Sequence, residues 1–287
     1  MLKRRVKSGM TPDIIVPGAL RSIQKFGCFK EVAVVLWPPP APCFTGAPAH
    51  YREPVDELPE AVSPAHGEHL HGGGLRGVII DWGGVLTNSI ADTVNDWLEA
   101  DLIDKRSYTA VIRPWISQAY EGDPMGGPIH RLERGLGDPA EFERELAARL
   151  IRTDGTPVPA AGLLSRMFAG SEPIPAMCDL MRTLRGAGIR TCLLSNSWGN
   201  NAYPRELFPE LFDAWIISAE VGIRKPEEGI FLHAAAQLGL PPRQCVFIDD
   251  VKANVDAATA LGMAGVHHRD AVSTTARLAG LLNLPLS

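Results

Sequence analysis

Basic residues are not in excess in this chain, and long apolar runs are missing. The 28 Lys and Arg face 33 Asp and Glu, which gives a net charge of −5. A surface that binds nucleic acid needs a positive field, and a membrane-spanning helix needs about 18–20 apolar residues in a row. We therefore expect no nucleic-acid or membrane partner, and a soluble protein that binds a small molecule or another protein.

Cysteine is scarce and shows no pairing pattern. The five cysteines, an odd number, form no Cys-x-x-Cys pair and no spacing suited to zinc. Cys178, Cys192 and Cys245 lie in apolar stretches, where a buried free thiol is the simplest interpretation. A signal peptide is not expected either, because no apolar segment stands close behind the basic residues at positions 3–5. These features predict a cytoplasmic protein.

Residues 1–74 form a Pro/Gly-rich extension. Prolines cluster over residues 38–64, and the stretch closes on three glycines. Such a composition buries too little apolar surface to offset the entropy of ordering the chain, so we expect disorder. His66, His69 and His71 could suggest a metal-binding tract. Beside the glycines, a solvated linker is the better interpretation.

Helices and strands alternate in the second half of the chain. Alternation of this kind is typical of a parallel sheet with helices on both faces. We therefore predict an α/β fold with a Rossmann-like, doubly wound parallel sheet. Its strands are expected over residues 78–80, 189–194, 215–218, 245–248 and 265–267.

A mostly helical stretch interrupts this alternation after the first strand. Within it Phe142 and Leu146 stand at i and i+4, which gives a helix one apolar stripe. We predict a core over residues 75–87 and 173–287, with residues 88–172 inserted as a helical cap.

Asp81 follows the first predicted strand, at the place where a site would form. Open α/β sheets hold their ligands beyond the carboxyl ends of their strands. Trp82, Gly83 and Gly84 come next, and glycines let backbone N–H groups approach an anion closely. The segment therefore suits a nucleophile or ligand beside a bound anion.

Two later segments suit a phosphate. Ser195 directly follows the predicted strand 189–194 and offers a hydroxyl donor, with Asn196 directly after it. Lys225, which precedes Pro226, offers a point charge.

A fourth segment suits a metal. Asp249 and Asp250 end the predicted strand 245–248 and offer the hard oxygen ligands that Mg²⁺ prefers, and Asn254 stands one helical turn beyond, placed to orient them. Two carboxylates ~4 Å apart repel by about 4 kcal/mol at an effective dielectric near 20. Lys225 alone cannot neutralise these two acids and Asp81, whereas a divalent cation together with Lys225 can. Capping of the next helix is the simpler role for either acid alone.

In this order the four segments resemble the four motifs of the haloacid dehalogenase-like (HAD) hydrolase superfamily, over about residues 75–287. Residues 81–87 and 222–226 are most similar to subfamily I, in the branch of the N-terminal phosphatase domain of soluble epoxide hydrolases and related sugar-phosphate phosphatases. The resemblance implies in-line phosphoryl transfer, in which Asp81 attacks phosphorus and forms an aspartyl-phosphate.

The resemblance also implies the roles of the other residues. Mg²⁺ would be held by Asp81, the Gly83 carbonyl and Asp250, with Asp249 acting through water. Catalysis would then consist mainly of positioning and charge neutralisation. The phosphoryl oxygens would be held by Ser195, Asn196, Lys225 and the backbone of Trp82 and Gly83.

Gly83 departs from the family pattern. Most HAD phosphatases carry there a second Asp, which protonates the leaving group and later activates water. Such general acid–base help raises the reaction rate about 10²–10⁴-fold. A phosphomutase cycle depends strongly on the second acid, so phosphomutase activity is disfavoured. Either the substrate has a good leaving group, such as an anomeric or acyl phosphate, or a cap residue supplies the proton. Glu121, Asp123 and His130 are the candidates in the cap.

The predicted function is Mg²⁺-dependent hydrolysis of a small phosphomonoester, with a small phosphorylated metabolite as partner. A phosphate-binding protein without turnover is the first alternative, because of Gly83. The second is a metal-independent 2-haloacid dehalogenase, in which Asp81 attacks carbon; the pair Asp249 and Asp250 counts against it. The sequence sets neither the substrate nor the oligomeric state.

Overall fold

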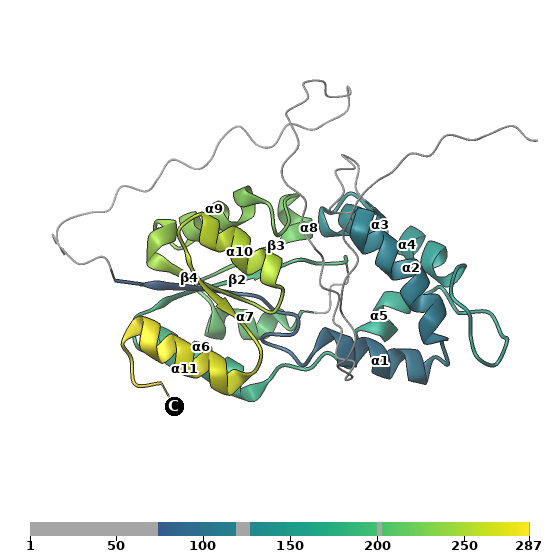
Figure 1. Cartoon of the computed structure of the whole chain (residues 1–287), viewed down its shortest axis with the longest axis horizontal. Coiled ribbons are helices and arrows are strands. Elements are labelled where there is room, and N and C mark those ends of the chain that lie inside the picture. The colour runs from purple at the N-terminus through teal and green to yellow at the C-terminus, as the bar shows by residue number, and fades with distance from the viewer. Residues whose placement is uncertain (1–73, 119–126, 200–202, 287) are drawn as a thin grey trace, which may run out of the picture. The chain divides into compact units, whose positions relative to one another are not determined.

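A five-stranded parallel sheet forms the centre of the fold (Figure 1). The structure, a computed structural model, describes residues 74–118, 127–199 and 203–286. The predicted α/β class and all five predicted strands are confirmed, with their ends shifted by one residue at most. In the order β3-β2-β1-β4-β5, the strands are β1 (Gly77–Ile80), β2 (Arg190–Ser195), β3 (Ala214–Ile217), β4 (Cys245–Asp249) and β5 (Ala264–His267).

The register of the central strands aligns the ends that carry the polar segments. Ile80 of β1 lies opposite Leu193 of β2 on one side and Ile248 of β4 on the other. The residues that follow Ile80 and Ile248 are Asp81 and Asp249, so these two acids leave the sheet at the same level.

Helices cover both faces of the sheet, and β1 is therefore buried along its whole length. Val78 and Ile80 face the apolar cluster under α6, α7 and α11, while Ile79 faces the cluster under α9 and α10 (Figure 1). A fully buried side chain of this size contributes about 1.5–3 kcal/mol. The doubly wound arrangement is therefore confirmed. The core elements are α6 (Pro175–Gly186), α7 (Phe208–Leu211), α8 (Ser218–Val221), α9 (Glu228–Gln237), α10 (Lys252–Ala260), α11 (Ala271–Leu282) and the 3₁₀ turns η1 (Arg205–Leu207) and η2 (Pro242–Gln244).

The inserted helices form an apolar cluster of their own. Phe142 and Leu146, which carry the predicted stripe, are 3% and 0% exposed, and they pack there with Trp97 and Trp115. We call residues 88–172 the cap, and its boundaries with the core stay a prediction. Its helices are α1 (Ile90–Ala100), α2 (Lys105–Gln118), α3 (Pro128–Glu133), α4 (Pro139–Ala147) and α5 (Leu163–Met167).

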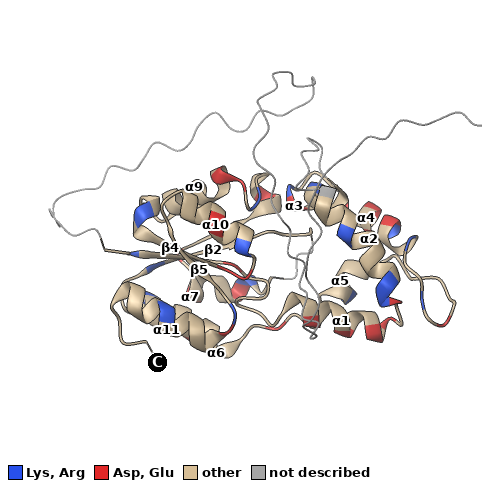
Figure 2. Ribbon diagram, in the orientation of Figure 1, with Lys and Arg blue, Asp and Glu red and all other residues tan. Residues whose placement is uncertain are grey.

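Buried thiols and mixed surface charge characterise the described part of the chain. Cys178, Cys192 and Cys245 are free and buried, as predicted. Acidic and basic side chains both occur on helices of the core and of the cap (Figure 2). None of the described helices is long and apolar enough to cross a membrane.

Candidate active site

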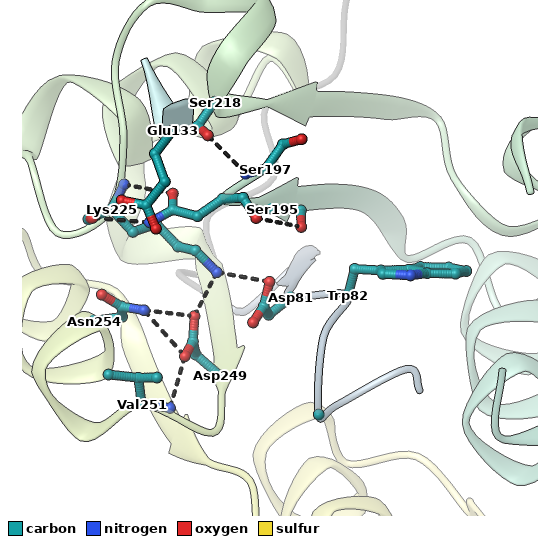
Figure 3. A network of polar contacts seen from close by, with 12 residues as sticks. Asp81, Trp82, Glu133, Ser195, Ser197, Ser218, Lys225, Asp249, Val251 and Asn254 are labelled. Atoms are coloured by element: carbon teal, nitrogen blue, oxygen red, sulfur yellow. Dashed lines mark hydrogen bonds and ion pairs between the residues drawn. The ribbon is translucent and has the colours of Figure 1, made fainter. Parts of the chain in front are cut away.

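Asp81 lies directly beyond β1, at the centre of the sheet. Its N–H donates to the Ile248 carbonyl at 3.0 Å, which extends the pairing of β1 and β4 by one residue. The residue is 8% exposed, and its Oδ1 lies 2.7 Å from Nζ of Lys225. The predicted nucleophile is therefore almost buried and is oriented by an ion pair (Figure 3).

Lys225 lies buried between two carboxylates. Its Nζ is 2.7 Å from Oδ1 of Asp81 and 2.7 Å from Oδ2 of Asp249. Asn196 fixes the backbone of Lys225: its Oδ1 accepts the Lys225 N–H at 2.9 Å, and its Nδ2 donates to the Lys225 carbonyl at 3.0 Å. Asn196, predicted to bind phosphate, thus contacts Lys225 through both ends of its side-chain amide.

Asp249 uses both oxygens within the protein. Oδ2 accepts from Lys225 Nζ at 2.7 Å and Oδ1 accepts from the Val251 N–H at 2.8 Å, while Nδ2 of Asn254 lies 3.2 and 3.1 Å from the two oxygens. These contacts engage both oxygens of the carboxylate. A metal ion would have to displace one of them to bind Asp249 directly. Asp81 and Asp250 are therefore better suited as direct ligands.

Three carboxylates converge beside Lys225. Asp81, Asp249 and Asp250 each offer an oxygen, and these atoms lie within 4.8 Å of one another. Gly84 allows this approach, because its φ is +75° and a Cβ there would come within 2.6 Å of Oδ2 of Asp250. A cluster of hard oxygen donors fits a divalent cation such as Mg²⁺.

The charges of this cluster are unbalanced. Burial raises the pKa of Asp81 to about 8; Lys225 opposes the rise, and the neighbouring acids add to it. Burial and Asp249 raise the pKa of Asp250 to about 6. Burial favours neutral Lys225, but Asp249 and Asp81 outweigh that effect and raise the pKa of Lys225. Lys225 therefore stays charged, yet the pKa values of Asp81 and Asp250 remain raised beside it. A divalent cation would supply the missing positive charge.

Ser195 ends β2 next to a residue that the sequence did not indicate. Its Oγ lies 2.9 Å from the hydroxyl of Tyr203. The ring of Tyr203 packs against Trp82, with centroids 5.9 Å apart, and against Phe208. Trp82 points its side chain away from the Asp81 carboxylate (Figure 3), so only its backbone is placed for the predicted phosphate contact. Tyr203 stands two residues before η1 and carries no spacing signal that would single it out.

Gly83 has an apolar neighbour where the family pattern has a second acid. A Cβ at Gly83 would lie 3.0 Å from Cδ1 and 3.3 Å from Cγ1 of Ile90, the first residue of α1. A longer side chain there would require Ile90 to move. The space beside Gly83 is thus filled by hydrocarbon.

His130 is the one proton-donor candidate of the cap that lies within the described residues. Burial, together with the charges of Arg224 and Arg134, lowers the pKa of His130 to about 3. The imidazole is therefore neutral at pH 7, which counts against a role as general acid. Glu121 and Asp123 lie outside the described residues.

A buried ion pair joins the cap to the core beside Lys225. Glu133 of α3 accepts from Nε of Arg224 at 2.5 Å and from Nε1 of Trp198 at 3.3 Å. The side chains of Glu133 and Arg224 are 9% and 6% exposed. Burial raises the pKa of Glu133, and Arg224 opposes the rise. No sequence pattern indicates this pair, whose members are 91 residues apart.

The geometry agrees with a match to a family model. The model of haloacid dehalogenase-like hydrolases matches residues 75–262, which include every residue of the predicted site. The chain belongs to this family. The family predicted from the four segments is thereby confirmed, and the protein is a HAD-like hydrolase.

Curated relatives of this HAD-like hydrolase include phosphatases. It is 30% identical to the sesquiterpene phosphatase astK of Aspergillus oryzae over 156 residues, which are 53% of this chain and 78% of that protein. It is 28% identical to the bifunctional epoxide hydrolase 2 of Sus scrofa over 211 residues. That match covers 68% of this chain but only 37% of the pig protein.

Solved structures of HAD enzymes share the fold. A HAD-like family hydrolase from Porphyromonas gingivalis superposes with a TM-score of 0.51 and 26% identity, over 71% of this chain and 97% of that one. A HAD family enzyme from Bacteroides thetaiotaomicron, solved in complex with magnesium and inorganic phosphate, has a TM-score of 0.50 and 23% identity over 68% and 95% of the two chains. At that identity the second likeness concerns the fold alone.

Proposed function

We propose that this HAD-like hydrolase releases phosphate from a small phosphorylated metabolite in a Mg²⁺-dependent reaction. One observation carries the proposal: oxygens of Asp81, Asp249 and Asp250 converge within 4.8 Å, beside the buried ammonium group of Lys225. Such a site combines a carboxylate nucleophile, a cation for phosphoryl oxygens and ligands for a metal.

Asp81 is the proposed nucleophile. One of its oxygens attacks phosphorus, the bond from phosphorus to the leaving oxygen breaks, and the leaving group departs with the electron pair and takes up a proton. Water then attacks phosphorus, the bond to Asp81 breaks, and inorganic phosphate leaves. Lys225 offsets negative charge on Asp81 and on the phosphoryl group, and the Ser195 hydroxyl donates to a phosphoryl oxygen.

Mg²⁺ is the proposed cofactor, because the donors are hard oxygens. Asp81, Asp250 and the Gly83 carbonyl would hold the ion, with Asp249 acting through water. When bound, the ion would neutralise charge on the phosphoryl oxygens.

Two further observations support this assignment. The relative from Aspergillus oryzae is named a phosphatase, which favours a phosphate ester over a haloacid. A metal-independent dehalogenase has no use for the three converging carboxylates of the site.

The buried free thiols of Cys178, Cys192 and Cys245 suit a reducing compartment, which supports a cytoplasmic location.

Phosphate binding without turnover is the second candidate. It is favoured by Gly83, where the side chain of Ile90 takes the place of an acid. Loss of general acid help costs about 10²–10⁴-fold in rate. A substrate with a good leaving group, such as an anomeric or acyl phosphate, would retain turnover.

Phosphate release from sugar, acyl and aryl phosphates, with Mg²⁺ or with EDTA, tests the proposal. We expect release that needs Mg²⁺ and falls more than about 10³-fold in Asp81→Asn, because the nucleophile is lost. Asp96→Asn, an exposed carboxylate in α1, is the matched control and should leave the rate unchanged. Mg²⁺-dependent phosphate binding without release from any substrate would favour the second candidate.

A further inference from the structure

Two hydroxyl groups form a short contact at the proposed phosphate site. Ser195 is 3% exposed, and its Oγ lies 2.9 Å from the Tyr203 hydroxyl, where either atom could donate. A hydroxyl has one hydrogen to donate and can accept others. If Ser195 donates its hydrogen to a phosphoryl oxygen, it can only accept from Tyr203. The direction of this hydrogen bond therefore decides whether Ser195 is available to the substrate.

The Tyr203 hydroxyl can act as the donor in its contact with Ser195, at 2.9 Å. Burial raises the pKa of Tyr203, and the charge of Asp81 adds to the rise. The hydroxyl thus keeps its proton at neutral pH.

Packing holds Tyr203 in this position. Its ring lies 5.9 Å from the ring of Trp82 and 6.1 Å from that of Phe208, between centroids. Trp82 directly follows the nucleophile Asp81 in the chain, so the ring that fixes Tyr203 belongs to the nucleophile loop. The other acceptor near Ser195 Oγ is the Asn196 carbonyl, at 3.5 Å. Without Tyr203 the serine hydroxyl would lose the partner that orients it.

We propose that Tyr203 is a positioning residue, whose hydroxyl donates to Ser195 and thereby directs the Ser195 hydrogen toward the phosphoryl group. The inference rests on the proposed function, because it takes phosphate as the ligand of Ser195. Tyr203 acts through Ser195 and takes no part in bond making or breaking. It extends the phosphate site from the strand ends into the loop before η1.

A double-mutant cycle tests this role. Tyr203→Phe keeps the ring and removes the hydroxyl, Ser195→Ala removes the hydroxyl that it orients, and the double variant combines them. The readouts are the inhibition constant of inorganic phosphate and the KM for an aryl phosphate, both with Mg²⁺. Tyr108→Phe is the matched control, because Tyr108 is a half-buried tyrosine that packs on Trp97 within the cap.

Tyr203→Phe should raise the inhibition constant of inorganic phosphate by about two- to twelve-fold, the effect expected when one hydrogen bond is lost. In the Ser195→Ala background the same change should have no further effect, because the residue it orients is gone. Unchanged inhibition in Tyr203→Phe, an equal effect in both backgrounds, or an equal effect of Tyr108→Phe would overturn the proposal.

Calorimetry separates this proposal from the proposed function. If the wild-type protein binds phosphate with Mg²⁺ but releases none from any ester, the phosphatase assignment fails. The double-mutant cycle is then measured through phosphate dissociation constants. Tyr203→Phe should again weaken binding in the wild-type background and have no further effect in the Ser195→Ala background. If the wild-type protein binds no phosphate, the role of Tyr203 fails as well.

Discussion

Among single residues, Lys225 keeps two acids of the site together. Its Nζ lies 2.7 Å from both Asp81 and Asp249, and the residue is 2% exposed. Removing one partner from a buried ion pair leaves an uncompensated charge, which costs about 3–5 kcal/mol. The same ammonium group faces the proposed phosphoryl position. Stability and function therefore depend on one side chain.

Lys225→Met should lower the free energy of unfolding by about 3–5 kcal/mol and abolish phosphate release, because it removes the charge and keeps the length of the side chain. Urea unfolding at pH 7 without metal measures the first effect. Lys105→Met, at an exposed position of α2, should change neither quantity. A variant as stable as the wild-type protein would contradict this view of the ion pair.

The residues of the site differ in how far the sequence indicated them. Asp81, Ser195 and Asp249 could be located because each stands where a buried apolar strand ends. Asn196 was predicted to bind phosphate, and its amide contacts the Lys225 backbone, a pairing that spacing does not reveal. Tyr203 could not be found, since it stands eight residues after Ser195 and no helical or strand spacing relates the two.

Between structural elements, the pair of Glu133 and Arg224 ties α3 of the cap to the loop that carries Lys225. Arg224 directly precedes Lys225 in the chain, so the position of the cap is coupled to that of Lys225. Trp198, in the loop after β2, contacts the same carboxylate. A shift of the cap would therefore disturb two of the loops that line the site.

Glu133→Gln should lower the free energy of unfolding by about 1.5–3 kcal/mol, the value of a hydrogen bond to a charged group. It should also raise KM, because the cap is held less firmly. Urea unfolding and steady-state kinetics measure the two effects. Glu141→Gln, exposed on α4, is the control, and equal behaviour of both variants would refute the coupling.

For the whole molecule, the four polar segments become one site only through the parallel sheet. The sequence predicted the strands well because they are short apolar runs bounded by polar residues and glycines. The contacts between cap and core were not predicted, since they join residues about 90 positions apart, as in Glu133 and Arg224. Hydrophobic pattern specifies which face of a helix is buried, and it does not specify the polar partner that the helix meets.

Mg²⁺ should stabilise the folded chain, because it relieves the repulsion among three acids that only the fold brings together. At a free concentration of 100 times Kd, binding adds about 2.7 kcal/mol, which corresponds to a rise in Tm of roughly 5–11 °C for a domain of this size. Differential scanning fluorimetry with Mg²⁺ and with EDTA measures the shift. Asp250→Asn should lose most of it and Asp96→Asn should retain it; an equal shift in both variants would place the metal elsewhere.

Asp81 should become phosphorylated in a Mg²⁺-dependent step. Beryllofluoride mimics the phosphoryl group of an aspartyl-phosphate, and it requires no knowledge of the substrate. Fluorine NMR should show bound beryllofluoride for the wild-type protein and for Asp96→Asn when Mg²⁺ is present. The signal should vanish with EDTA and in Asp81→Asn. A bound signal that persists in Asp81→Asn, or no bound signal in the wild-type protein, would rule out Asp81 as the phosphorylated residue.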